Sequence, residues 1–137
     1  MSILTSIISL AETPPDGSKT PDTNSKRISK FVIIIGKEEA HFVFGPLETY
    51  AYHAGILKRF CDMKQIPSGW VKKPDMYEIY GNTYKVKGGG WLEEKTGEKS
   101  LRIFGYSTAY GGFDRQDVLY LFENTPGFED HKIDFDD

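Results

Sequence analysis

Short runs of apolar residues, many of them β-branched or aromatic, recur along most of the chain and are separated by Gly, Pro, Asp and Asn. This pattern is typical of strands joined by turns. The run KFVIII at 30–35 is apolar at every position after its lysine, so it predicts a central strand covered on both faces. The glycines at 88–90 predict a bulge or a close approach to the backbone. Six extended segments are predicted: 30–35, 39–44, 76–80, 83–93, 100–106 and 131–135.

Two segments have the helical period instead. The first runs from 47 to about 65, with Pro46 suited to a helix start, and a loop is predicted to follow at 67–74. The second begins near Asp114, whose carboxylate can cap the first N–H groups, and ends before Pro126. Together these elements predict an α+β fold. We expect an α/β sandwich in which one mixed sheet carries a helix on each face, or both helices on one face.

The first 27 residues differ from the rest of the chain. Residues 13–26 are rich in Pro, Ser, Asp, Thr and Gly and predict a flexible linker. The segment before this linker has apolar residues at helical spacing: Ile3, Leu4, Ile7 and Ile8. It is interpreted either as a short amphipathic turn that docks on a protein partner or as a disordered end. The chain therefore divides into an arm, 1–27, and a folded domain, 28–137.

The length of 137 residues provides one domain. The 17 Lys and Arg residues are outnumbered by 20 Asp and Glu residues, so the basic face that nucleic-acid binding needs is not indicated. No apolar run is long enough to span a membrane, and the first residues lack the basic segment of a secretory signal. We expect a cytoplasmic protein that neither binds nucleic acid nor inserts into a membrane.

Cysteine and histidine give no sign of a metal site. Cys61 is the single cysteine, so no disulfide can form within the chain. The three histidines, His41, His53 and His131, are far apart and lack the i, i+4 spacing of a helical metal site. We expect neither a metal ion nor another cofactor.

The stretch FGYSTAYGG at 104–112 consists largely of small residues between a predicted strand and a predicted helix. In such a junction several backbone N–H groups converge, and the helix dipole favours negative charge. Ser107 and Thr108 add hydroxyl donors. The stretch is therefore interpreted either as a site for an anionic group or as a plain tight connection.

His53 and Lys30 occupy positions that suggest chemistry. His53 falls within the apolar stripe of the first predicted helix, where it is either a core residue or a general base. Burial would lower its pKa and keep the ring neutral, which a general base requires. Since no serine or cysteine nucleophile motif is present, activation of a water is the simplest reaction. Lys30 is either a solvated strand end or a cation beside a bound oxyanion.

Four motifs, in their order and spacing, resemble the family of the 14 kDa phosphohistidine phosphatase and the janus/ocnus proteins. They are SKFVIII at 29–35, YAYHAGI at 50–56, KGGGW at 87–91 and RIFGYSTAYG at 102–111. The resemblance extends from about residue 30 to 135. It implies a single domain with a mixed six-stranded sheet flanked by two helices. It also implies metal-free hydrolysis of phosphohistidine, with a phosphorylated protein or peptide as substrate.

The resemblance implies roles for individual residues. His53 matches the general base that activates the attacking water, and Lys30 matches a lysine that helps to bind phosphate. Ser107, Thr108 and Ala109 match a loop that holds phosphoryl oxygens through N–H and hydroxyl groups. Tyr106 matches a tyrosine that helps to shape the pocket. Tyr52, which precedes His53, is a further candidate outside these matched roles.

Two positions depart from the family pattern. The arginine that follows the three glycines in the phosphatase is Trp91 here, and the arginine before the first helix is replaced at Phe44 or Gly45. Phosphoryl transfer depends on charge stabilisation, which Lys87 could partly restore if its side chain faced the pocket. The alternative function is therefore a catalytically weak or inactive member, acting as a structural or binding subunit of a larger assembly through residues 1–27.

Overall fold

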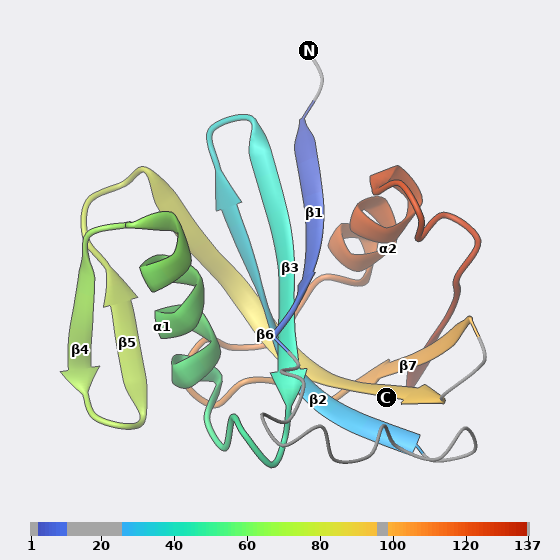
Figure 1. The fold of residues 1–137 in the computed structure, drawn as a ribbon, viewed down its shortest axis with the longest axis horizontal. Helices are drawn as coiled ribbons and strands as arrows, with labels where there is room; N and C mark the ends of the chain where they lie inside the picture. Colours follow the sequence, from blue (N-terminus) through green and yellow to red (C-terminus); the bar gives the residue numbers. More distant parts are fainter. Residues whose placement is uncertain (1–2, 11–25, 96–98, 137) are drawn as a thin grey trace, which may run out of the picture.

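The computed structural model describes residues 3–10, 26–95 and 99–136 of the chain. These residues form two helices and eight strands (Figure 1). In chain order they are β1 (Leu4–Ser9), β2 (Lys26–Gly36), β3 (Glu39–Pro46), α1 (His53–Lys64), β4 (Ser68–Lys72), β5 (Met76–Ile79), β6 (Tyr84–Lys95), β7 (Ser100–Phe104), α2 (Arg115–Asn124) and β8 (Lys132–Asp136).

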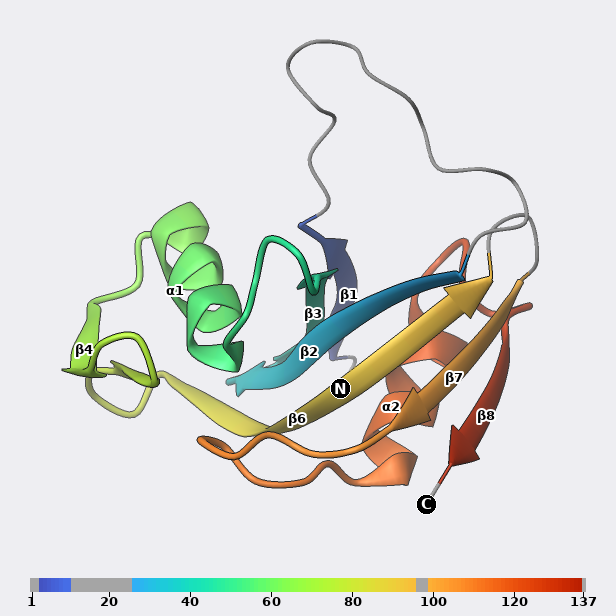
Figure 2. The same ribbon diagram turned by 90° about the horizontal axis from the view of Figure 1, so that it is seen from below.

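Six of these strands form one mixed sheet in the order β1-β3-β2-β6-β7-β8. The inner pairs are antiparallel, whereas the edge strands β1 and β8 run parallel to their neighbours β3 and β7. Figure 2 shows β2, β6, β7 and β8 side by side along one half of the sheet. The predicted α+β fold with a mixed six-stranded sheet flanked by two helices is confirmed.

Helices α1 and α2 cover opposite faces of the sheet (Figure 1). Successive residues of β2 alternate between them: Val32 and Ile34 pack in the cluster with α1, and Phe31 and Ile33 pack in the cluster with α2. All four side chains are buried. The apolar run at 30–35 is therefore a central strand covered on both faces, as predicted.

Strand β1 corrects the prediction of a helical turn near the start of the chain. Residues 4–9 pair in parallel with residues 39–44 of β3. Because neighbouring strand residues point to opposite faces, Ile8 packs on the α1 cluster and Ile7 on the α2 cluster. Adjacent apolar residues thus fit a strand covered on both faces as well as a helix. The predicted linker lies outside the described residues, except for its last residue, which begins β2.

The segment 67–74 was predicted to be a loop, and this prediction is wrong because it contains β4. Strand β4 pairs with β5 in a separate two-stranded sheet, so the strand predicted at 76–80 exists but does not join the main sheet. Tyr77 of β5 packs with the α1 cluster, and its ring meets that of Trp70 edge-on at 5.1 Å. The β4–β5 hairpin is therefore attached beside α1 (Figure 1).

Helix α1 begins at His53, later than the predicted start at 47. The chain before it turns instead, since the N–H groups of Thr49 and Tyr50 both donate to the carbonyl of Pro46. The Tyr50 ring lies against Gly45, where a Cβ atom would come within 2.4 Å of it. The late start places His53 in the first turn of the helix, at its N-terminal end, rather than in the middle of an apolar stripe.

The second helix and the last strand agree with the sequence. The Asp114 carboxylate accepts a hydrogen bond from the N–H of Gln116 at 2.9 Å and caps α2, as predicted. Strand β8 forms the predicted last edge of the sheet. Within the ranges that the structure describes, neither helix has the length and apolar character needed to cross a bilayer.

Candidate active site

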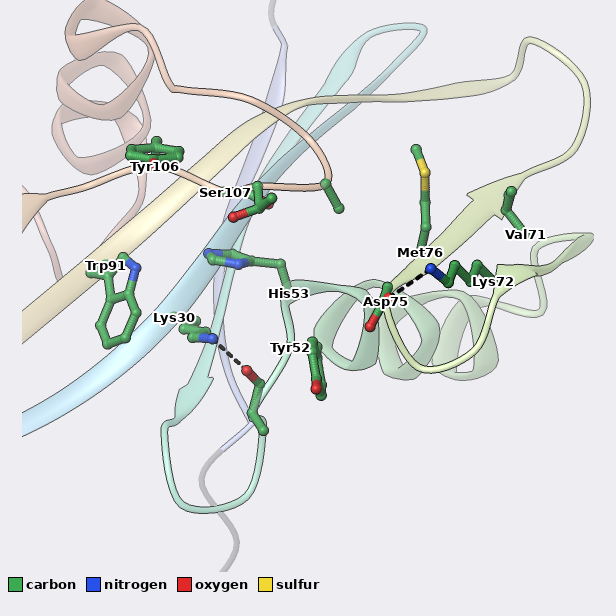
Figure 3. A pocket seen from close by; sticks show the side chains of 13 residues that line it. Lys30, Tyr52, His53, Val71, Lys72, Asp75, Met76, Trp91, Tyr106 and Ser107 are labelled. Carbon is green, nitrogen blue, oxygen red and sulfur yellow. Dashed lines mark hydrogen bonds and ion pairs between the residues drawn. The ribbon is translucent and has the colours of Figure 1, made fainter.

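A pocket of about 590 Å³ opens where the loop after β7, the start of α1 and the β4–β5 hairpin meet (Figure 3). Strands β2 and β6 each contribute a side chain to it. Apart from Lys87, the candidate site residues predicted from the sequence all line this pocket: Lys30, Tyr52, His53, Tyr106, Ser107, Thr108 and Ala109. Residues distant in sequence therefore share one hollow.

The His53 ring is buried, with 7% of the residue exposed. Its Nε2 atom donates to the carbonyl oxygen of Gly90 at 2.9 Å. Because a carbonyl oxygen can only accept, Nε2 carries the hydrogen and the neutral ring leaves Nδ1 as an acceptor. No partner for Nδ1 is found among the described residues, and His53 lines the pocket. One ring nitrogen fixes the orientation, and the other remains for a reactant.

Burial lowers the pKa of His53 below its usual value of 6.5. The hydrogen bond to Gly90 opposes this shift, and the positive charge of Lys30 adds to it. The net lowering keeps the imidazole neutral at physiological pH. A neutral ring with a free Nδ1 atom has the protonation state of a general base.

The glycines at 88–90 make room for this ring. A Cβ atom at Gly89 would lie 3.2 Å from Cδ2 of His53 and 2.3 Å from the carbonyl oxygen of Phe31. The pairing of β2 with β6 also shifts register between Val32 and Ile34. Both features predicted from the glycines, a bulge and a close approach to the backbone, are confirmed.

Lys30 extends from β2 toward the start of α1. Its Nζ atom donates to the carbonyl oxygen of Ala51. Burial lowers the pKa of Lys30 below 10.5, although the amine remains a cation at neutral pH. A positive charge is thus held at the edge of the pocket near His53 (Figure 3).

Lys30 belongs to a row of residues that crosses four strands. Its register partners are Gly45 of β3 and Trp91 of β6, and Trp91 in turn pairs with Phe104 of β7. The ammonium group lies 4.9 Å from the centre of the Trp91 ring, a cation–π contact. Of the two positions considered for the second missing arginine, Gly45 lies in this row, whereas Phe44 packs in the α2 cluster. In this row, the cation of Lys30 therefore has the Trp91 indole on one side and Gly45 on the other.

The loop after β7 is closed by its own hydrogen bonds. Ser107 and Gly111 exchange N–H···O bonds at 3.1 and 2.8 Å, and the Ser107 Oγ atom accepts from the N–H of Tyr110 at 3.1 Å. The Ser107 N–H is therefore occupied within the loop. Across the described ranges, no acceptor is found for the N–H groups of Thr108 and Ala109, which line the pocket. These two amides are the ones that can meet an anion.

The start of α1 adds a feature that the sequence did not predict. Tyr52 is its N-cap, and no side-chain oxygen caps the helix. The first N–H groups of a helix have no partner within it, and its dipole is positive at that end. Since Ala51, Tyr52 and His53 all line the pocket, this positive end faces the same space. The sequence missed this feature because it predicted the helix to start at 47, which would put the N-terminal end before Ala51.

The remaining candidates have other positions. Lys87 forms an ion pair with Asp117 of α2 at 3.2 Å and does not line the pocket, so it does not occupy the place of an absent arginine. Tyr52 and Tyr106 are 47% and 65% exposed at the rim. Among the described residues, no cluster of His, Cys, Asp and Glu side chains suits a metal ion.

One wall of the pocket was missed by the sequence. It is contributed by the β4–β5 hairpin: Val71, Lys72, Asp75 and Met76. The segment carries no motif, and its first strand was predicted to be a loop. Short apolar stretches, Trp70–Val71 in β4 and Met76–Tyr77 in β5, were the available signal, and they do not indicate that the hairpin leaves the main sheet.

The sequence was also compared with models of protein families. The model of the Janus/Ocnus family (Ocnus) matches residues 22–131. The chain therefore belongs to the Janus/Ocnus family. A comparison with curated proteins finds no match.

Proposed function

We propose that this protein hydrolyses phosphohistidine in proteins or peptides, with His53 as the general base and without a metal ion. The observation that carries the proposal is the Nδ1 atom of His53, which has no partner in the described part of the chain and belongs to a residue that lines the pocket. Lys30, Thr108 and Ala109 line the same pocket. The motifs that resemble the phosphohistidine phosphatase support the same activity.

The proposed reaction is attack of a water on phosphorus. Nδ1 of His53 accepts one proton from the water while the water oxygen bonds to phosphorus and the bond from phosphorus to the substrate imidazole breaks. The leaving ring nitrogen then takes up one proton from solvent, and His53 returns the proton that it accepted to solvent. One water is consumed, and hydrogen phosphate and an unmodified histidine are released.

Three groups would oppose the negative charge on the phosphoryl oxygens. They are the Lys30 ammonium, the N–H groups of Thr108 and Ala109, and the N-terminal end of α1. The loop hydrogen bonds and the contact of Lys30 with Ala51 hold these groups in place before a substrate arrives. Donors that are already oriented need little reorganisation during the reaction.

Binding without turnover is a second candidate function. The row of Gly45, Lys30 and Trp91 favours it, because Lys30 is the one cation in this row, where the family pattern adds arginines. Anchoring through residues 1–27 has less support, since Ile7 and Ile8 pack in the two clusters of the protein itself.

The test is release of phosphate from a phosphohistidine peptide in the presence of a metal chelator. Wild type is expected to release phosphate, and His53→Ala to be slower by about a hundredfold or more, as is typical for loss of a general base. Circular dichroism checks that the variant is folded. Equal rates for the two proteins would contradict the proposal. Peptide binding without release by either protein would favour the second candidate.

A further inference from the structure

The pocket has two chemically different ends (Figure 3). His53, Ser107 and Lys30 lie toward one end, and Val71 and Met76 of the β4–β5 hairpin lie toward the other. The proposed phosphoryl chemistry uses only the first end. Because both ends belong to one hollow, a substrate held at the first also meets the second.

The hairpin end is apolar and carries little net charge. Val71 is 55% exposed, although it is a large aliphatic residue. The two charged residues of this wall, Lys72 and Asp75, form an ion pair at 3.7 Å and so offset each other. Single exposed apolar residues are ordinary, but exposed Val71 and partly exposed Met76 line the same wall of one pocket. This end suits an apolar side chain better than a charged one.

Tyr110 fixes the β4–β5 hairpin relative to the loop after β7, which contains Ser107, Thr108 and Ala109. Its hydroxyl donates to the carbonyl of Tyr77 at 2.7 Å and accepts from the N–H of Tyr77 at 3.0 Å. Its own N–H donates to Ser107 Oγ. Tyr77 is the residue after Met76 in β5, so the loop and the apolar wall are joined through one side chain. Because these hydrogen bonds already hold the wall in place, substrate binding does not have to supply the free energy of ordering it.

We propose that Val71 and Met76 form a subsite for a large aliphatic side chain within two residues of the phosphohistidine in the substrate chain. This inference rests on the proposed function for the identity of the substrate. A phosphohistidine that reaches His53 leaves its backbone at the pocket mouth, and successive residues advance by about 3.3–3.8 Å. Residues one or two places away therefore lie within about 7–8 Å of the phosphohistidine along the chain, and the hairpin wall lines the same pocket as His53.

The test uses peptides with a non-hydrolysable phosphohistidine analogue. One position, one or two residues to either side, is Leu, Ala or Asp, and binding is measured by calorimetry. In the best position wild type is expected to bind the Leu peptide about tenfold more tightly than the Ala peptide, as burial of an aliphatic side chain allows. The Asp peptide is expected to bind no better than the Ala peptide.

The variant Val71→Ala/Met76→Ala is expected to bind the Leu and Ala peptides with nearly equal affinity. Met63→Ala is the matched control, because Met63 is 46% exposed on α1 and lies outside the pocket; it is expected to keep the wild-type preference. Equal binding of both peptides by wild type at every position, or an unchanged preference in the double variant, would overturn the subsite.

Phosphate release from the corresponding phosphohistidine peptides separates the two proposals. A preference for Leu in binding, without release, would support the subsite while the proposed catalysis fails. Release at one rate from Leu and Ala peptides, together with equal binding, would support the catalysis and exclude the subsite.

Discussion

Two histidines are buried beside the same helix and differ in what their rings can do. His41 is 1% exposed and packs against Phe60 of α1, and His53 is 7% exposed in the first turn of that helix. Both ring nitrogens of His41 have partners: Nδ1 meets the Ser6 hydroxyl, and Nε2 meets the Glu39 carboxylate at 2.7 Å. In His53, Nε2 has a partner, and among the residues that the structure describes Nδ1 has none.

The two histidines show that burial alone does not identify a candidate base. The hydrogen bond between Ser6 and His41 joins β1 to β3. The bond between His41 and Glu39 lies within β3, and it holds the pKa of Glu39 below its usual value. His53 instead has one nitrogen fixed by a carbonyl and another that is left for a reactant in a pocket. A candidate base is therefore recognised by a ring nitrogen that has no hydrogen-bond partner, in a residue that lines a pocket. Both ring nitrogens of His41 have partners.

The largest expected effect comes from removing each ring in turn. His53→Ala is expected to lower kcat by about a hundredfold or more. His41→Ala is expected to keep kcat near wild type and to lower the free energy of unfolding by about 2–4 kcal/mol, because a buried, fully bonded side chain is lost. Phosphate release and urea denaturation, measured on both variants, check this. Loss of activity in a fully folded His41→Ala would show that the comparison is drawn wrongly.

The sequence predicted much of the fold because its strongest signals are local. The run at 30–35 and the Asp114 cap each have one physical explanation, and both were confirmed. For the glycines at 88–90 the sequence left two, a bulge or a close approach to the backbone, and the structure has both. The start of α1 was misplaced because helical spacing continues upstream into a turn that is set by contacts of Tyr50 with Gly45.

The candidate site was predicted only in part. Motifs led to His53, Lys30 and the loop at 107–109, which share the pocket. Which amides of the loop remain free depends on the bonds between Ser107 and Gly111, and no pattern of residue types specifies them. The hairpin wall depends on a long-range attachment through Tyr110, which local periodicity does not encode.

A smaller effect is expected from crowding the His53 ring. Gly89→Ala places a Cβ atom too close to the Phe31 carbonyl and against the ring, so β6 or the ring must move. We expect a loss of about 1–3 kcal/mol in stability and a fall of about tenfold in kcat. Gly112→Ala is the control, because a Cβ atom there meets nothing within 4 Å. Equal activity of Gly89→Ala and wild type would indicate that the ring position does not matter.

The dependence of kcat/KM on pH tests the protonation states. Since the pKa of His53 is lowered, activity is expected to fall only when the pH drops below 6.5, about tenfold per unit once the ring is charged. The lowered pKa of Lys30 predicts a second decline that begins below pH 10.5 as the cation is lost. Protonation of His53 also favours the unfolded chain, so stability falls in acid. An acid limb centred above pH 6.5 would contradict the neutral, buried ring.

The smallest expected effect concerns the row that flanks Lys30. Trp91→Arg removes a cation–π contact between two partly exposed side chains, worth roughly 0.5–2 kcal/mol. It adds a guanidinium, whose charge-assisted hydrogen bonds are worth about 1.5–3 kcal/mol each. The new hydrogen bonds are expected to contribute more than the lost cation–π contact. If the new side chain reaches the phosphoryl group, kcat/KM should therefore rise by a few-fold to tenfold. Trp91→Leu, which removes the ring and adds no charge, is expected to lower it. A lower kcat/KM in both variants would mean that the cation–π contact between Trp91 and Lys30 contributes more than an added guanidinium. This row would then be adapted to a single cation.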